Sequence, residues 1–61
     1  MKVALIGNHG KIQYIEKDKI KIGEWINSPN GAGFIDSING NFITINKKAS
    51  GIFTTVEMIQ L

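Results

Sequence analysis

The side chains that could carry acid–base or nucleophilic chemistry are few, and their spacing follows no pattern. The single histidine, His9, stands in a glycine-flanked stretch typical of a tight turn. Serines and aspartates that could complete a triad are Ser28, Ser37, Ser50, Asp18 and Asp36. Nothing in their spacing distinguishes a nucleophile, a base and an acid from chance. We therefore expect no enzyme and no catalytic residue, and interpret His9 as a solvated turn residue.

Phosphate or metal binding is also weakly supported. Residues 30–33, Asn-Gly-Ala-Gly, contain two glycines, but a phosphate-cradling loop needs a following helix or a lysine at fixed spacing. The carboxylates of Glu16, Asp18 and Glu24 alternate with lysines, which is the pattern of a solvated mixed-charge face. The chain offers almost none of the soft ligands that zinc prefers, because it has no cysteine and only one histidine. We expect neither a cofactor nor a metal.

Nucleic-acid binding is the serious alternative, because small β-barrels combine lysines that track phosphates with aromatic side chains that stack on bases. The candidate residues are Lys17, Lys19, Lys21, Trp25, Lys47 and Lys48, with Lys11 as a further cation and Tyr14, Phe34 and Phe42 as further platform residues. The net charge is only +2, and no arginine is present for bidentate or stacking contacts. A chain this small also needs large side chains inside, so Trp25 and the phenylalanines are expected in the core.

The length of 61 residues allows one domain, 1–61, with a thin core. A chain of about 60 residues buries only about 60% of the surface that its unfolded form exposes, so small scaffolds usually need a further source of stability. Disulfides are excluded, since there is no cysteine. Self-association or an unusually well-packed barrel remains. We expect a homo-oligomer or a larger protein partner.

The composition is that of a folded, soluble chain, with 43% hydrophobic and 20% charged residues. No apolar run approaches the roughly 20 residues of a membrane span, and no signal peptide is apparent. We expect no membrane partner and a cytoplasmic location, which the missing cysteines fit. Twelve isoleucines against two leucines, with lysine but no arginine, indicate AT-rich coding. Such coding is common in low-GC bacteria and their phages, where chains of this size are often accessory proteins.

Turn residues divide the chain into short β-rich segments. Breaks at 7–10, 16–18, 28–33, 39–41 and 47–51 separate runs at 2–6, 11–15, 19–27, 34–38, 42–46 and 52–61. Strands of this length and spacing predict an all-β fold. We expect a small antiparallel meander barrel or sandwich of five to six strands, Src-homology-3-like or OB-like in architecture only.

Local signals refine this picture. Asn39-Gly40 predicts a hairpin with a type I′ turn, and Gly7 to Gly10 predicts another. Residues 28–33 are expected to form a six-residue loop, a frequent place for binding. In residues 19–27 alternation places Ile20 and Ile22 inward, and a bulge at Gly23 would align Trp25 with them.

The last segment, 52–61, is expected to be a strand, with a short C-terminal helix as the alternative because Thr54 and Glu57 have capping-box spacing. As a strand it would expose apolar side chains on a terminal edge, where another chain could add. The predicted partner-binding residues are Ile59, Leu61, Phe53 and Ile35. The sequence thus favours a non-enzymatic protein-binding or assembly module, such as a small regulator, inhibitor or structural accessory protein, acting through an exposed strand edge.

Overall fold

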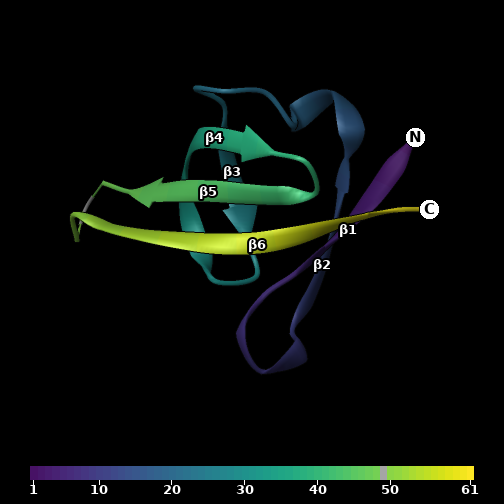
Figure 1. Ribbon diagram of the computed structural model, residues 1–61, viewed down its shortest axis with the longest axis horizontal. Coiled ribbons are helices and arrows are strands. Elements are labelled where there is room, and N and C mark those ends of the chain that lie inside the picture. The colour runs from purple at the N-terminus through teal and green to yellow at the C-terminus, as the bar shows by residue number, and fades with distance from the viewer. Residues whose placement is uncertain (49) are drawn as a thin grey trace.

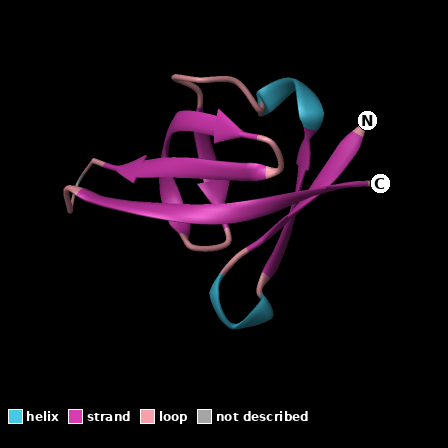
Figure 2. Cartoon of the chain, in the orientation of Figure 1, coloured by secondary structure: helices cyan, strands magenta, loops and turns pink. Residues whose placement is uncertain are grey.

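The computed structural model describes residues 1–48 and 50–61, which form six strands and two short 3-10 turns (Figure 1, Figure 2). The strands are β1 (Lys2–Ile6), β2 (Ile12–Glu16), β3 (Trp25–Ser28), β4 (Gly31–Asn39), β5 (Phe42–Lys47) and β6 (Ile52–Gln60). The 3-10 turns are η1 (Asn8–Gly10) and η2 (Lys17–Lys19). The predicted all-β class is confirmed, and residues 52–60 are a strand as expected.

All six strands belong to one antiparallel sheet in the order β2-β1-β6-β5-β4-β3, which curls into a nearly closed barrel. Its exposed surface of 3939 Å² matches the roughly 3,900 Å² expected for a folded monomer of this mass. Within the described residues no helix is long and apolar enough to cross a membrane. Because β2 and β3 stand at the two ends of the strand order, they are the edges at which the barrel remains open.

The core that the structure describes is built from branched aliphatic side chains and Met58. The buried side chains that pack together are Val3, Leu5, Ile26, Ile35, Ile43, Ile45, Val56 and Met58. Ile43 and Ile45 alternate with the half-buried Thr44, as their spacing predicts. All five aromatic side chains are exposed, with Trp25 at 52%. The expectation that Trp25 and the phenylalanines fill the core is wrong, because all four stand at outward-facing positions of their strands.

The terminal strand β6 is not an edge. It pairs with β5 through residues 52–57 on one side and with β1 through residues 57–60 on the other, so the two pairings overlap only at Glu57. The addition of another chain at this strand stays a prediction, although β6 is an interior strand in the sheet order. Figure 1 shows β6 running across the molecule between the two groups of strands that it joins.

Residues 19–27 do not form one strand. Lys19 ends η2, residues 20–24 form a connection with a turn at Ile22 and Gly23, and the strand begins at Trp25. The bulge at Gly23 does form: its N–H donates to the Ile35 carbonyl at 2.8 Å, and the Ile35 N–H donates to the Glu24 carbonyl at 2.9 Å. Two residues thus oppose one, and Gly23 has φ 90° as a glycine bulge requires. The consequence differs from the prediction, since Ile26 and not Trp25 turns inward.

Two predicted turns form with different chemistry. The β4–β5 hairpin has Gly40 and Asn41 as its central residues, because Asn39 pairs with Phe42. Gly40 has φ 62° at the first central position, the arrangement of a type II′ turn rather than the expected type I′ turn. Residues 28–33 are not a six-residue loop. They form a tight hairpin in which Ser28 pairs with Gly31, closed by a hydrogen bond of 2.5 Å from the Ser28 hydroxyl to the Gly31 carbonyl.

Candidate partner-binding seam and aromatic row

The hydrogen bonds at the two ends of the β1–β2 ladder fix which backbone groups of β2 point outward. The Gly7 N–H donates to the Lys11 carbonyl at 2.8 Å, and the Lys17 N–H donates to the Met1 carbonyl at 2.8 Å. Hydrogen-bonded and non-bonded pairs alternate along an antiparallel ladder. The bonded residues of β2 are therefore Gln13 and Ile15. The N–H and carbonyl groups that point to the open edge are those of Ile12, Tyr14 and Glu16.

The same reasoning applies to β3. The bond from the Ile35 N–H to the Glu24 carbonyl makes that pair hydrogen-bonded. With the register of β3 on β4, the next bonded pairs involve Ile26 and Ser28. The backbone groups of Trp25 and Asn27 are left pointing to the open edge. Both edges of the sheet thus present unpaired backbone groups, at alternate residues.

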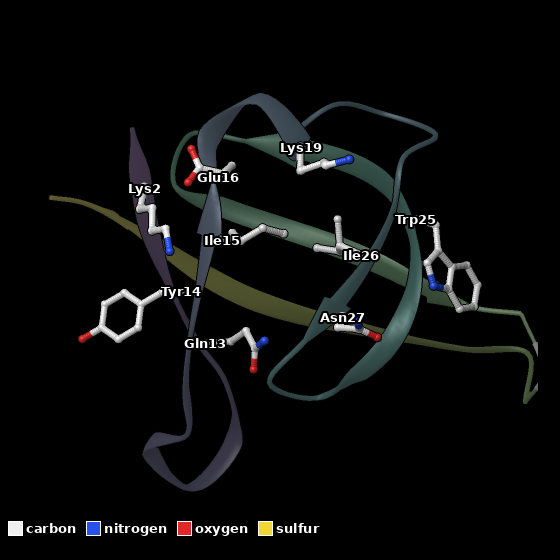
Figure 3. A pocket seen from close by; sticks show the side chains of 9 residues that line it. All are labelled: Lys2, Gln13, Tyr14, Ile15, Glu16, Lys19, Trp25, Ile26 and Asn27. Atoms are coloured by element: carbon white, nitrogen blue, oxygen red, sulfur yellow. The ribbon is translucent and has the colours of Figure 1, made fainter.

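The two edges face one another across a hollow of about 370 Å³, within the roughly 300–1,000 Å³ of ligand pockets. We call this hollow the seam; it is lined by residues 13–16 of β2, residues 25–27 of β3, Lys2 and Lys19. Figure 3 shows Ile15 and Ile26 pointing toward each other between the two strands. Because Ile26 is buried and Ile15 is half-buried, these two side chains form an apolar floor.

Charged side chains gather at one end of the seam. Lys19 extends over it from η2, and Lys2 and Glu16 lie on the β1–β2 side (Figure 3). The Glu16 carboxylate accepts a hydrogen bond of 3.2 Å from the amino group of Met1, the one ion pair formed within residues 1–48 and 50–61. The carboxylate of the seam is thus engaged, whereas its two lysines outnumber it.

A second surface is a row of aromatic side chains on the outer face. Trp25 pairs with Phe34, Phe34 with Asn46, and Asn46 with Phe53, so the four side chains lie on one face of neighbouring strands. The rings of Trp25 and Phe34 meet edge to face, with centroids 4.8 Å apart. We call Trp25, Phe34 and Phe53, together with Asn46 between the two phenylalanines, the aromatic row. The Nζ of Lys48 lies 5.9 Å from the Phe34 centroid, within cation–π range.

The predicted nucleic-acid residues are only partly brought together. Trp25 and Lys19 both line the seam, and Lys48 stands beside the aromatic row. A hollow of about 310 Å³ next to Phe34 places Asp36 in the same lining as Lys48, which offsets that cation.

The remaining predicted cations lie elsewhere. The Lys17 Nζ donates to the Gln60 side-chain carbonyl at 3.1 Å, away from the aromatic row. The end of the Lys47 side chain lies against Gly31, where a Cβ would come within 3.0 Å of the Lys47 Cε. Lys21 is exposed in the loop between η2 and β3. The described lysines therefore form no continuous basic stripe.

The predicted partner-binding residues also separate. Ile59, Leu61 and Phe53 are exposed, at 42%, 70% and 52%. Ile35 is 1% exposed and belongs to the core, so it cannot contact a partner in the folded barrel. Phe53 belongs to the aromatic row, whereas Ile59 lies at the other half of β6, opposite Ala4.

The seam residues Gln13, Ile15, Ile26 and Asn27 escaped the sequence reasoning. One signal was available: residues 12–16, Ile-Gln-Tyr-Ile-Glu, contain no lysine and no proline. Edge strands usually carry lysine or proline, which hinders pairing with a strand of another chain. A strand without lysine or proline is typical of a sheet interior or of an edge at which another chain can pair.

A further hollow of about 360 Å³ lies under the β1–β2 loop and is lined by His9, Lys11 and Asn30 among others. His9 is exposed there and has φ 60°, in keeping with a turn residue. Among the described residues no three histidine, aspartate or glutamate side chains converge as metal ligands would. No protein-family model, curated protein or solved structure matches the chain.

Proposed function

We propose that this chain is a non-enzymatic protein-binding or assembly module that takes an extended segment of a partner as an added strand at the seam. The carrying observation is the pair of facing sheet edges, each with unpaired backbone groups, over an apolar floor. Strand addition obtains affinity from main-chain hydrogen bonds and specificity from alternate side chains. The predicted mode of action is kept, but its place moves from β6 to β2 and β3.

The edge of β2 offers the larger share of main-chain contacts. Three of its residues, Ile12, Tyr14 and Glu16, direct an N–H and a carbonyl outward, and each hydrogen bond made contributes about 1 kcal/mol. Contact of the segment with Ile15 and Ile26 would add the burial of apolar surface. These terms together support binding without any catalytic group.

A single substitution separates strand addition from contact with side chains. Tyr14→Pro removes an N–H that points to the open edge, where proline is tolerated in sheets, so the fold should persist while pairing is blocked. Tyr14→Thr is the matched control, because it removes the ring but keeps the N–H. We expect a short synthetic peptide of alternating valine and threonine to bind the wild-type protein and Tyr14→Thr, measured by fluorescence anisotropy, and Tyr14→Pro to lose binding.

Hydrogen exchange of the backbone amides tests the same proposal independently. Peptide bound at β2 should slow exchange of the Ile12, Tyr14 and Glu16 amides and leave the Gln13 amide unchanged. Equal binding by Tyr14→Pro and the wild type would refute strand addition at this edge.

A second copy of the chain is one partner that the same edge admits. Two β2 strands can pair antiparallel about a two-fold axis, which would give a closed dimer. Light scattering distinguishes this case: a dimer that becomes monomeric in Tyr14→Pro but not in Tyr14→Thr would identify the copy as the partner. A monomer at high concentration would leave a different protein as the partner.

Single-stranded nucleic acid is a second candidate, favoured by the exposure of the aromatic row beside Lys48. Stacking of a base on an exposed aromatic ring is worth about 1–3 kcal/mol. The net charge of +2 and the nearby Asp36 weigh against it. Oligothymidylate should bind at low salt if this candidate holds, and Phe53→Ser, outside the seam, should weaken it. No mobility shift at low salt would remove nucleic acid from consideration.

A further inference from the structure

We infer that the segment taken up at the seam runs antiparallel to β2 and carries its acidic residues at its N-terminal end. This inference rests on the proposed strand addition and adds the direction and the charge of the partner segment. It follows from the order of the six strands and from the placement of lysines around the seam.

The strand order fixes the relative direction of the two edges. Five antiparallel pairings connect β2 to β3 through β1, β6, β5 and β4. An odd number of reversals makes β2 and β3 antiparallel to one another. One strand inserted between them must therefore be antiparallel to one edge and parallel to the other.

The antiparallel partner is β2. Antiparallel pairing is the more stable arrangement per residue, and β2 directs three residues' backbone groups outward where β3 directs two. Because β2 runs from Ile12 to Glu16, a segment antiparallel to it begins beside Glu16 and ends beside Ile12. The N-terminal end of the segment thus lies at the end of the seam where its lysines gather.

The charges at that end favour carboxylates on the incoming segment. Lys2 and Lys19 line the seam, and the carboxylate of Glu16 is held by the Met1 amino group. Lys17 and Asp18 of η2 are close in sequence and offset each other. At the opposite end of β2, Lys11 lines the separate hollow under the β1–β2 loop and not the seam. A carboxylate at the start of the segment would lie at the end of the seam that Lys2 and Lys19 line, whereas no lysine lines the seam at its other end.

The floor of the seam adds a requirement for alternation. The Ile15 and Ile26 side chains point toward each other and form the floor beneath the space that the segment would occupy (Figure 3). Side chains of a strand alternate between faces, so every second residue after the acidic ones should be apolar. The partner chemistry is therefore an extended protein segment with acidic residues first and alternating apolar residues after them.

Three synthetic peptides of equal length test this inference. Each has alternating valine and threonine; one carries two aspartates at its N-terminal end, one carries them at its C-terminal end, and one carries asparagines at its N-terminal end. Binding to the full chain is measured by fluorescence anisotropy at low and moderate salt. We expect the acid-first peptide to bind roughly fivefold to tenfold tighter than the other two, with the preference declining as salt rises.

Variants locate the preference on the protein. Lys19→Gln and Lys2→Gln should each reduce it, and the double variant should abolish it while leaving the asparagine peptide's affinity unchanged. Lys11→Gln is the matched control and should keep the full preference. All these positions are exposed, so circular dichroism should show an unchanged fold.

The outcomes separate the inference from the function on which it rests. Equal affinity for all three peptides, with loss of binding in Tyr14→Pro, would overturn the direction and charge while strand addition stands. Tighter binding of the acid-last peptide would reverse the direction and also overturn the inference. Binding of none of the three peptides by the wild-type protein would overturn strand addition itself, as would equal binding of the acid-first peptide by Tyr14→Pro and the wild type.

Discussion

The side-chain amide of Asn30 donates a hydrogen bond of 2.9 Å to the hydroxyl of Thr54, 24 residues further along the chain. The same amide reaches the Thr55 carbonyl at 3.3 Å, and the Asn30 Oδ1 accepts from the Asn8 N–H at 2.7 Å. One side chain thus joins the β3–β4 turn to β6 and to the β1–β2 loop. Gly7 makes room for it, since a Cβ there would collide with the Asn30 Oδ1.

Asn30→Ala should destabilise the barrel by about 2 kcal/mol, because three hydrogen bonds with a net value of about 1 kcal/mol or less each are lost. Asn30→Asp should also destabilise the barrel, since it keeps the acceptor for the Asn8 N–H but sets a carboxylate oxygen against the Thr55 carbonyl. The midpoint of urea unfolding measures both. Equal midpoints for Asn30→Ala and the wild type would show that the turn is held by other contacts.

Gly33→Ala should destabilise the barrel by about 1–3 kcal/mol, the usual range for overpacking. A Cβ at Gly33 would lie 2.6 Å from the Asn46 carbonyl oxygen and 2.7 Å from the Ile45 Cγ2. Gly33 thus packs tightly against the neighbouring strand β5. Gly10→Asn is the control, because no heavy atom lies within 4 Å of a Cβ there and asparagine tolerates the φ of 73°. Thermal unfolding followed by circular dichroism compares them, and similar midpoints would contradict the close approach.

Proline substitutions along β2 should alternate in their effect on stability. Gln13→Pro removes an N–H that bonds to β1, whereas Tyr14→Pro removes one that points to the open edge. Gln13→Pro should therefore lower the free energy of unfolding by at least about 1 kcal/mol more than Tyr14→Pro. Urea unfolding measures the difference. The reverse order would mean that the phase of the ladder is shifted by one residue and that the seam presents other groups.

Ile35→Ala and Ile59→Ala should differ sharply although both residues were predicted to contact a partner. Ile35 is buried in the core, and removing such a side chain costs about 2–5 kcal/mol, which a barrel of this size can scarcely tolerate. Ile59 is exposed, and its truncation should cost less than about 0.5 kcal/mol. Loss of cooperative unfolding in Ile35→Ala alone would bear out this distinction, and equal effects would contradict it.

Much of the fold was predictable because its signals are local. Gly40 needs a positive φ that few residues tolerate, so the β4–β5 hairpin was identified from two residues, although its turn type was not. The bulge at Gly23 followed from the break in alternation there. The expected core position of Trp25 and the phenylalanines was wrong, because the hydrophobicity of a residue does not distinguish the inner face of a strand from an exposed outer face.

By itself the sequence determined that this chain forms short antiparallel strands, because alternation and turn chemistry act over a few residues. Only the tertiary structure decided which strands are edges. Pairing of Ala4 with Ile59 closes β6 between β1 and β5, and no local pattern specifies a contact between residues so far apart in the chain. That pairing places β6 inside the strand order and leaves β2 and β3 at its ends, so the place proposed for partner binding follows from the order of the strands.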